Sequence, residues 1–170
     1  DFGPRIPGTK AHEECKNYFV ETMKSFGAQV TEQDFKTRLA NKKIVSGTNI
    51  IASFQPEKKN RVLLCAHWDS RPFADMETDE SLHNTPIDGA NDGASGVGVL
   101  MEIGRLLGQQ ATEVGIDIIF FDLEDSGEYG DNDSWALGAQ YWSRNPHIPN
   151  YYARYGILLD MVGTANPTFK

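Results

Sequence analysis

The sequence contains no apolar run of about 18 residues, so no segment is predicted to cross a membrane as a helix. Basic residues are few: 16 lysines and arginines stand against 24 aspartates and glutamates, giving a net charge of −8. Because phosphate binding requires clustered lysine and arginine, this balance argues against nucleic acid as a partner. The acidity is typical of a solvated surface, and it is also consistent with metal ligands whose charge a bound cation offsets.

Cysteine is scarce as well. Cys15 and Cys65 are too few for a disulfide framework, and their spacing is not that of a zinc finger. Both lie in apolar patterns, which predicts two buried free thiols and does not reveal the compartment. The sequence also lacks an initiator methionine, a signal peptide and an internal repeat. It ends at Lys170, soon after the last strand-like run, so we expect a longer protein, for which export stays open.

The residues that are present suit one globular domain with a hydrophobic core, since 39% are apolar and 11% aromatic over 170 residues. Helical spacing of apolar residues predicts a helix from Thr9, its cap, to about Phe26. The same spacing predicts helices over residues 95–109 and 134–144. Alternating or continuous apolar runs predict strands over residues 28–38, 43–54, 61–66, 116–121 and 156–159.

The order of these elements predicts the fold class. The last three strands alternate with helices, and each is a short apolar run typical of a strand buried on both faces. We therefore expect an α/β domain with a mixed, largely parallel central sheet flanked by helices. The hairpin over residues 28–54 is expected to add antiparallel strands at one edge. The long polar loop over residues 69–92 is of a kind that is uncommon without a functional reason.

Acidic and imidazole side chains follow the three strands that are predicted to be buried. His67 and Asp69 come after the first strand, Glu124 and Asp125 after the second, and Asp160 after the third. In an open α/β sheet, ligands bind beyond the carboxyl ends of the strands. The fold is therefore expected to bring four of these side chains to one rim of the sheet: His67, Glu124, Asp125 and Asp160.

A sixth candidate, Asp92, lies in the glycine-rich run of residues 89–96 at the start of the second helix. Glycines allow close backbone approach, and a helix N-terminus favours a carboxylate. An imidazole and several carboxylates at one rim require a cation or protons to offset their charge, and oxygen ligands with imidazole suit a catalytic zinc. Each residue alone also has a structural alternative: Asp92 as a helix cap, Asp160 as a turn residue, Glu124 and Asp125 as a solvated loop, and His67 as a core histidine.

Four runs together resemble the zinc-dependent aminopeptidase superfamily, in order and at plausible spacing: residues 66–70, 89–96, 120–127 and 158–163. Within that superfamily, the lead-in GPRIPG and the run NPTF resemble the glutaminyl-peptide cyclotransferase branch, and the bacterial enzymes of animal type fit best (residues 3–8 and 166–169). The resemblance implies a zinc-exopeptidase-like (phosphorylase/hydrolase-like) fold. Residues 1–170 would then form one α/β domain, the N-terminal part of a longer one.

The resemblance also implies a role for each candidate. Asp92 and Asp125 match zinc ligands, and Glu124 matches the general base and acid. Asp160 matches a second-metal ligand in aminopeptidases and a hydrogen-bonding active-site carboxylate in cyclotransferases. His67 is similar to a ligand that is used only if a second metal binds, and Asp69 would orient His67 from behind.

Two departures from the family pattern stand out. The residue after the base is usually glutamate, and here it is Asp125, whose side chain is one methylene shorter. The family also has a C-terminal histidine ligand beyond the third strand motif, and His12, His83 and His147 do not match it. We therefore expect this ligand to lie beyond Lys170.

Three functions follow as alternatives. A cyclotransferase would convert N-terminal glutamine into pyroglutamate and release ammonia, with one zinc ion as cofactor. An aminopeptidase would hydrolyse the first peptide bond, with up to two zinc ions. A non-catalytic binding module is the third, and the intact Glu124 argues against it, because a carboxylate without a chemical task beside metal ligands is costly. For either enzyme the partner is a peptide or protein N-terminus, and the resemblance implies a periplasmic, cell-envelope or secreted location.

Overall fold

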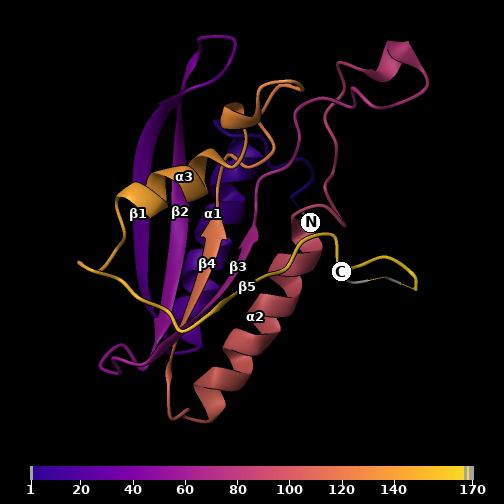
Figure 1. The fold of residues 1–170 in the computed structure, drawn as a ribbon. Helices are drawn as coiled ribbons and strands as arrows, with labels where there is room; N and C mark the ends of the chain where they lie inside the picture. The colour runs from indigo at the N-terminus through magenta and orange to yellow at the C-terminus, as the bar shows by residue number, and fades with distance from the viewer. Residues whose placement is uncertain (1, 167, 169–170) are drawn as a thin grey trace.

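The structure, a computed structural model, describes residues 2–166 and 168. Five strands form one sheet in the order β1-β2-β4-β3-β5 (Figure 1). Their bounds are β1 Gln29–Arg38, β2 Ile44–Phe54, β3 Arg61–His67, β4 Gly115–Phe121 and β5 Gly156–Leu158. β2 pairs antiparallel with both β1 and β4, whereas β3 pairs in parallel with β4 and β5. The mixed sheet and the antiparallel hairpin at one edge are therefore as predicted.

Helices cover both faces of this sheet. Their bounds are α1 Lys10–Ser25, α2 Ala94–Gln109 and α3 Leu137–Arg144, and short 3₁₀ turns lie at Glu80–Leu82 and Asn132–Ser134. Thr9 caps α1 as expected, because its side-chain oxygen accepts a hydrogen bond from the His12 amide at 3.3 Å. α1 and α2 pack together on one face, and α3 crosses the other face in front of the hairpin (Figure 1).

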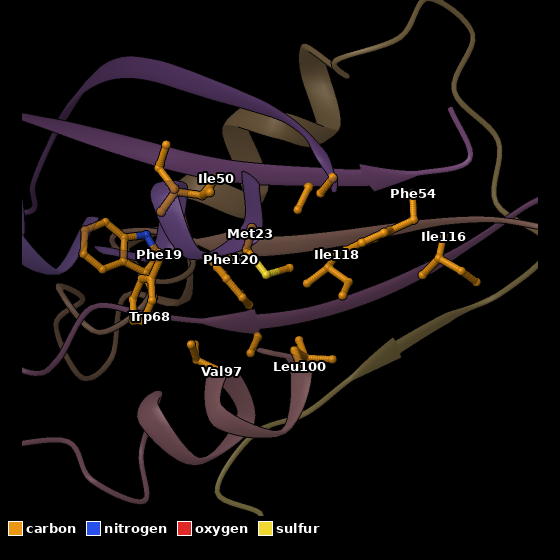
Figure 2. Close-up of a cluster of buried hydrophobic side chains, with 14 of the residues drawn as sticks. Phe19, Met23, Ile50, Phe54, Trp68, Val97, Leu100, Ile116, Ile118 and Phe120 are labelled. Atoms are coloured by element: carbon orange, nitrogen blue, oxygen red, sulfur yellow. The ribbon is translucent and has the colours of Figure 1, made fainter. Parts of the chain in front are cut away.

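The main core lies between the sheet and the α1–α2 pair (Figure 2). β4 is buried along its whole length because it has a strand on each side and helices above and below. Its residues Ile118 and Phe120 meet Met23 of α1 and Leu100 of α2 in this cluster. Each such buried side chain stabilises the fold by about 1.5–3 kcal/mol. Trp68 is part of the same core, so it is not available to line a substrate pocket.

The third helix and the last strand differ from the sequence prediction. The helix was expected to begin at residue 134, but it begins at Leu137, because Ala136 takes a left-handed conformation with a φ of 52°. The last strand was expected to be buried on both faces, yet Ile157 is 48% and Leu158 is 65% exposed. Among the described residues, β5 is an edge strand whose only strand neighbour is β3. An apolar run shows that a strand can be buried, but the neighbours that bury it are a tertiary property.

One smaller prediction is confirmed. Cys15 and Cys65 are buried free thiols. Over the part of the chain that the structure describes, there is no helix of the length and hydropathy that a bilayer crossing requires. The run NPTF, which resembles the cyclotransferase branch, spans residues 166–169. It lies partly outside the described residues, since Pro167 and Phe169 are not among them.

Candidate active site

The candidate residues converge because β3 and β4 are parallel neighbours. His67, the last residue of β3, lies opposite Phe121, the last residue of β4, so the segments that follow both strands start side by side. Potential metal-binding atoms of His67, Glu124 and Asp125 all lie within 4.8 Å of one another. The same holds for a second group, His67 with Asp92 and Asp160. The expected rim therefore exists, and His67 is common to both groups.

His67 is buried among the carboxylates. Its Nε2 lies 2.8 Å from Asp92 Oδ1 and 3.6 Å from Asp160 Oδ1. Its Nδ1 lies 3.5 Å from Asp69 Oδ1 and has no hydrogen-bond partner among the described residues. Burial alone lowers the pKa of His67, but contacts with Asp160, Asp69 and Asp92 outweigh burial and raise the pKa to about 12. The alternative of a satisfied core histidine does not fit a ring that has these carboxylates around it.

Glu124 and Asp125 are held in an environment that opposes their negative charge. Burial raises the pKa of Glu124; the His67 imidazole opposes this shift, and the Asp69 carboxylate adds to it. Burial, followed by the charge of Asp92, raises the pKa of Asp125 to about 7. Asp125 is buried, which contradicts the alternative of a solvated loop. A half-buried carboxylate (Glu124) and a buried one (Asp125), both with raised pKa values, share an imidazole. A divalent cation would stabilise such a donor set, so the residues fit a metal.

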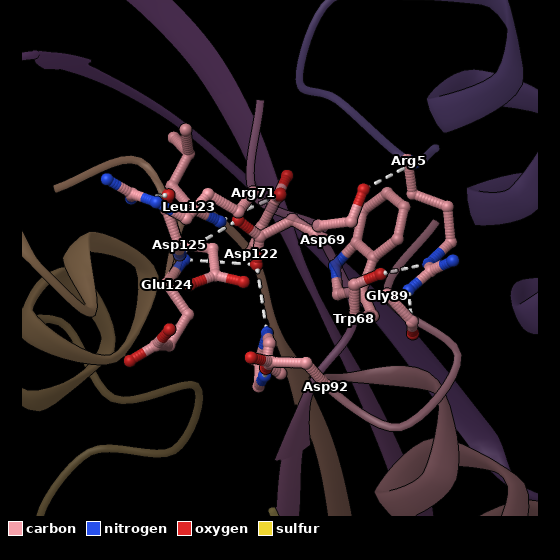
Figure 3. Close-up of polar contacts among 12 residues, drawn as sticks. Arg5, Trp68, Asp69, Arg71, Gly89, Asp92, Asp122, Leu123, Glu124 and Asp125 are labelled. Atoms are coloured by element: carbon pink, nitrogen blue, oxygen red, sulfur yellow. Dashed lines mark hydrogen bonds and ion pairs between the residues drawn. The ribbon is translucent and has the colours of Figure 1, made fainter. Parts of the chain in front are cut away.

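Asp69 makes contacts that the sequence did not predict. Its fully buried carboxylate accepts a hydrogen bond from the backbone N–H of Glu124 at 3.0 Å and from that of Asp125 at 3.1 Å (Figure 3). One oxygen atom serves each amide. The contact with His67, which was expected to be the function of Asp69, is longer, at 3.5 Å. Asp69 therefore fixes the backbone that carries the candidate base and a candidate ligand, in addition to facing the histidine.

The segment between β4 and Glu124 has a strained backbone, and buried hydrogen bonds hold it in place. Leu123 is buried with a φ of 56°, a left-handed conformation that is rare for a leucine. The buried carboxylate of Asp122 accepts hydrogen bonds from the Leu123 amide at 2.8 Å and the Thr48 amide at 2.7 Å. It also meets His12 Nε2 of α1 at 3.0 Å. This sharp turn directs Glu124 away from the core, and α1 helps to hold it.

Asp92 belongs to the site and not to the helix. The N-cap of α2 is Gly93, which has a φ of 79°, and no side chain makes a cap hydrogen bond there. The carboxylate of Asp92 instead contacts His67, so the helix-cap alternative is excluded. The predicted role of the glycines is confirmed at Gly96, where a Cβ atom would lie 2.2 Å from the carbonyl oxygen of Leu159. α2 therefore packs directly on the segment that leads to Asp160.

Two arginines that the sequence did not assign to the site support it. Arg5, from the lead-in GPRIPG, donates from Nε to the Trp68 carbonyl at 2.7 Å and from Nη2 to the Gly89 carbonyl at 2.9 Å (Figure 3). It thereby joins the segment after β3 to the glycine-rich turn before α2. The lead-in carries the resemblance to the cyclotransferase branch, but its sequence indicates no role for Arg5. Arg71 contacts the loop after Asp125, and nothing in the sequence distinguishes it from other loop arginines.

The sequence pattern of peptidase family M28 matches residues 49–170, which is most of the chain and includes every candidate residue. Two solved bacterial structures are similar to the chain over 99% of its length. They are Porphyromonas gingivalis glutaminyl cyclase and a Zn-dependent exopeptidase from Parabacteroides distasonis, each 54% identical with a TM-score of 0.97. The glutaminyl-peptide cyclotransferase of Drosophila melanogaster is 26% identical over 98% of the chain. The chain spans 46% of the length of the Drosophila protein and 59% of each bacterial chain.

Proposed function

The chain belongs to peptidase family M28, and we propose that the full-length protein is a zinc-dependent glutaminyl-peptide cyclotransferase. The observation that carries the proposal is the placement of Glu124 and Asp125 beside His67 at the rim of the sheet, in a fold that matches a glutaminyl cyclase at a TM-score of 0.97. The substrate is a peptide or protein whose first residue is glutamine. The product is a pyroglutamyl peptide, and ammonia is released.

The metal ligands in this proposal are Asp92, Asp125 and a histidine beyond Lys170. When bound, zinc acts as a Lewis acid that polarises an amide carbonyl. Asp92 is brought to the site by the glycine-rich turn before α2, and Asp125 by the turn after β4. His67 would become a ligand only with a second ion, for which Asp92 and Asp160 are its partners. We propose one ion per site.

Glu124 is proposed to move the proton. The α-amine of the substrate attacks the side-chain amide carbon of its own glutamine, so a carbon–nitrogen bond forms and a five-membered ring closes. Glu124 accepts the proton that the amine loses and delivers it to the departing ammonia as the original amide bond breaks. Asp160, which faces the same rim, is proposed to accept a hydrogen bond from the reacting amide. Because amine and amide belong to one residue, correct placement supplies much of the rate.

An aminopeptidase is the second candidate, favoured by the exopeptidase to which the chain is equally similar. In that reaction Glu124 would take a proton from water, and the first peptide bond would break. The two functions share the base and the ligands, so the site residues alone separate them poorly. What separates them is which bond of one substrate is broken.

The deciding experiment uses the full-length protein and glutamine joined to a chromogenic amine. A cyclotransferase releases ammonia and leaves the chromogenic amide intact, with one zinc per chain by atomic absorption. The leucine analogue is the matched control, because it has a cleavable amide but no side-chain amide. Release of the chromogenic amine from both substrates, with two zinc ions per chain, would refute the cyclotransferase and establish the aminopeptidase. A periplasmic, cell-envelope or secreted location is a further proposal, supported by the resemblance, and cell fractionation checks it.

A further inference from the structure

A buried arginine lies behind the loop of residues 125–129, here called the Asp125 loop. Arg71 is only 8% exposed. Its Nη1 donates to the carbonyl oxygens of Asp125 at 2.9 Å and Gly127 at 3.2 Å. On the other side, Nε donates to Asp75 Oδ1 at 2.7 Å, and Nη2 donates to Asp75 Oδ2. The guanidinium thus joins the segment after β3 to the Asp125 loop.

Aromatic rings complete the surroundings of this cation. The guanidinium carbon of Arg71 lies 4.8 Å from the ring centroid of Trp135 and 5.2 Å from that of Tyr129. The indole N–H of Trp135 donates to the Glu128 carbonyl at 3.2 Å. A Cβ atom on Gly127 would lie 2.2 Å from the indole ring, so the backbone at Gly127 packs directly against Trp135. Arg71 and Trp135 therefore hold the Asp125 loop together.

We propose that Arg71 is a positioning residue that sets the place of Asp125 as a metal ligand. The inference rests on the proposed role of Asp125. The peptide groups on both sides of this residue are held: Asp69 accepts from its N–H, and Arg71 donates to its C=O. The Asp125 side chain has a single methylene between the backbone and the carboxylate. The distance from that carboxylate to a bound metal therefore depends on where the backbone is fixed.

The geometry explains why this position suits arginine and not lysine. A guanidinium is planar and offers donors in several fixed directions, so it binds the Asp75 carboxylate with one edge and two carbonyls with another nitrogen. A lysine ammonium has the same charge but cannot reproduce the fork or stack flat on an indole. A lysine at position 71 would keep the positive charge, but we expect it not to hold the Asp125 loop in place.

The experiment measures zinc affinity in the full-length protein by competition with a chelator, and the ligand field by cobalt substitution. Arg71→Lys and Arg71→Met are expected to weaken zinc binding by about 10–100-fold, the usual effect of losing a group that orients a metal ligand. The cobalt absorption bands are expected to shift. Arg105→Met is the matched control: Arg105 forms a similar fork with Glu102, at 2.8 and 2.7 Å, on the exposed surface of α2. The zinc affinity of the Arg105→Met variant is expected to stay within about twofold of that of the parent.

Zinc affinity within threefold of the parent in folded Arg71→Met, with unchanged cobalt bands, would overturn the proposal. Should that variant not fold, Asp75→Asn decides instead, because it loosens the anchor of Arg71 but leaves its contacts with the loop carbonyls. A drop in zinc affinity of threefold or more in folded Asp75→Asn supports the proposal, and an unchanged affinity overturns it. These readouts do not depend on whether ammonia or an amine is released, so failure here is distinct from failure of the proposed reaction.

Discussion

Replacing Asp69 by asparagine tests how the site is held. The side chain keeps its size, but one of its two acceptor oxygens becomes an N–H₂ group. In the parent each oxygen accepts from one backbone amide, that of Glu124 or that of Asp125. In the variant one of these buried N–H groups faces a donor, which costs about 1–3 kcal/mol. The remaining hydrogen bond loses its charge, which costs about 1 kcal/mol more.

Two electrostatic changes accompany this loss, and they act in opposite directions. The Asp69 charge opposes ionisation of Asp125, so its removal relieves that repulsion. His67 loses a carboxylate at 3.5 Å, which removes a favourable contact. The hydrogen-bond terms therefore dominate, and Asp69→Asn is expected to lower the free energy of unfolding by about 2–4 kcal/mol.

The assay is urea unfolding of the full-length protein at neutral pH, followed by tryptophan fluorescence and by far-ultraviolet circular dichroism. Asp131→Asn is the control, because Asp131 also accepts from a loop amide, that of Asp133 at 3.2 Å, but is exposed. The control is expected to stay within about 0.5 kcal/mol of the parent. An Asp69→Asn variant as stable as the control, with unchanged turnover, would refute the conclusion that this carboxylate fixes the loop.

Three further predictions concern the base, the helix packing and a buried ion pair. Glu124→Gln is expected to keep its zinc content but lose about 10²–10⁴-fold in turnover, and more than a third of parental activity would exclude Glu124 as the base. Gly96→Ala is expected to destabilise the protein by about 1–3 kcal/mol in thermal unfolding, because the added methyl meets a backbone carbonyl; unchanged stability would contradict this close packing. Asp117 is fully buried and binds Arg61 through two hydrogen bonds of 2.6 Å. Burial alone raises the pKa of Asp117, but its polar contacts, those with His147 and Arg61 first, outweigh burial and hold the pKa below its usual range. Its stabilisation is therefore complete above about pH 4 and is lost as the pH falls below the unfolded-state value. Asp117→Asn is expected to cost about 3–5 kcal/mol at pH 7 and to flatten the acid side of the stability curve, and a parental acid slope in urea unfolding would contradict this.

The candidate site could be predicted from sequence to the extent that it depends on strand ends. His67, Glu124 and Asp125 follow apolar runs directly, and the parallel pairing of β3 with β4 brings them to one rim. Their assigned roles remain proposals. The supporting contacts were not predictable in this way. Arg71 lies 54 residues from Asp125 in the sequence, and no local pattern connects a loop arginine to a distant carbonyl.

Local physics determined most of the elements of this protein. The spacing of apolar residues follows from the local sequence alone. The same is true of the cap at Thr9 and of the glycines at which α2 packs closely. Tertiary structure decided the rest. Among the described residues, it determined that β5 is an exposed edge strand, that Trp68 belongs to the core, and that Asp69 holds the backbone of Glu124. The reason is that hydrogen-bond partners and burial are properties of pairs, and only the folded chain brings together groups that are far apart in sequence.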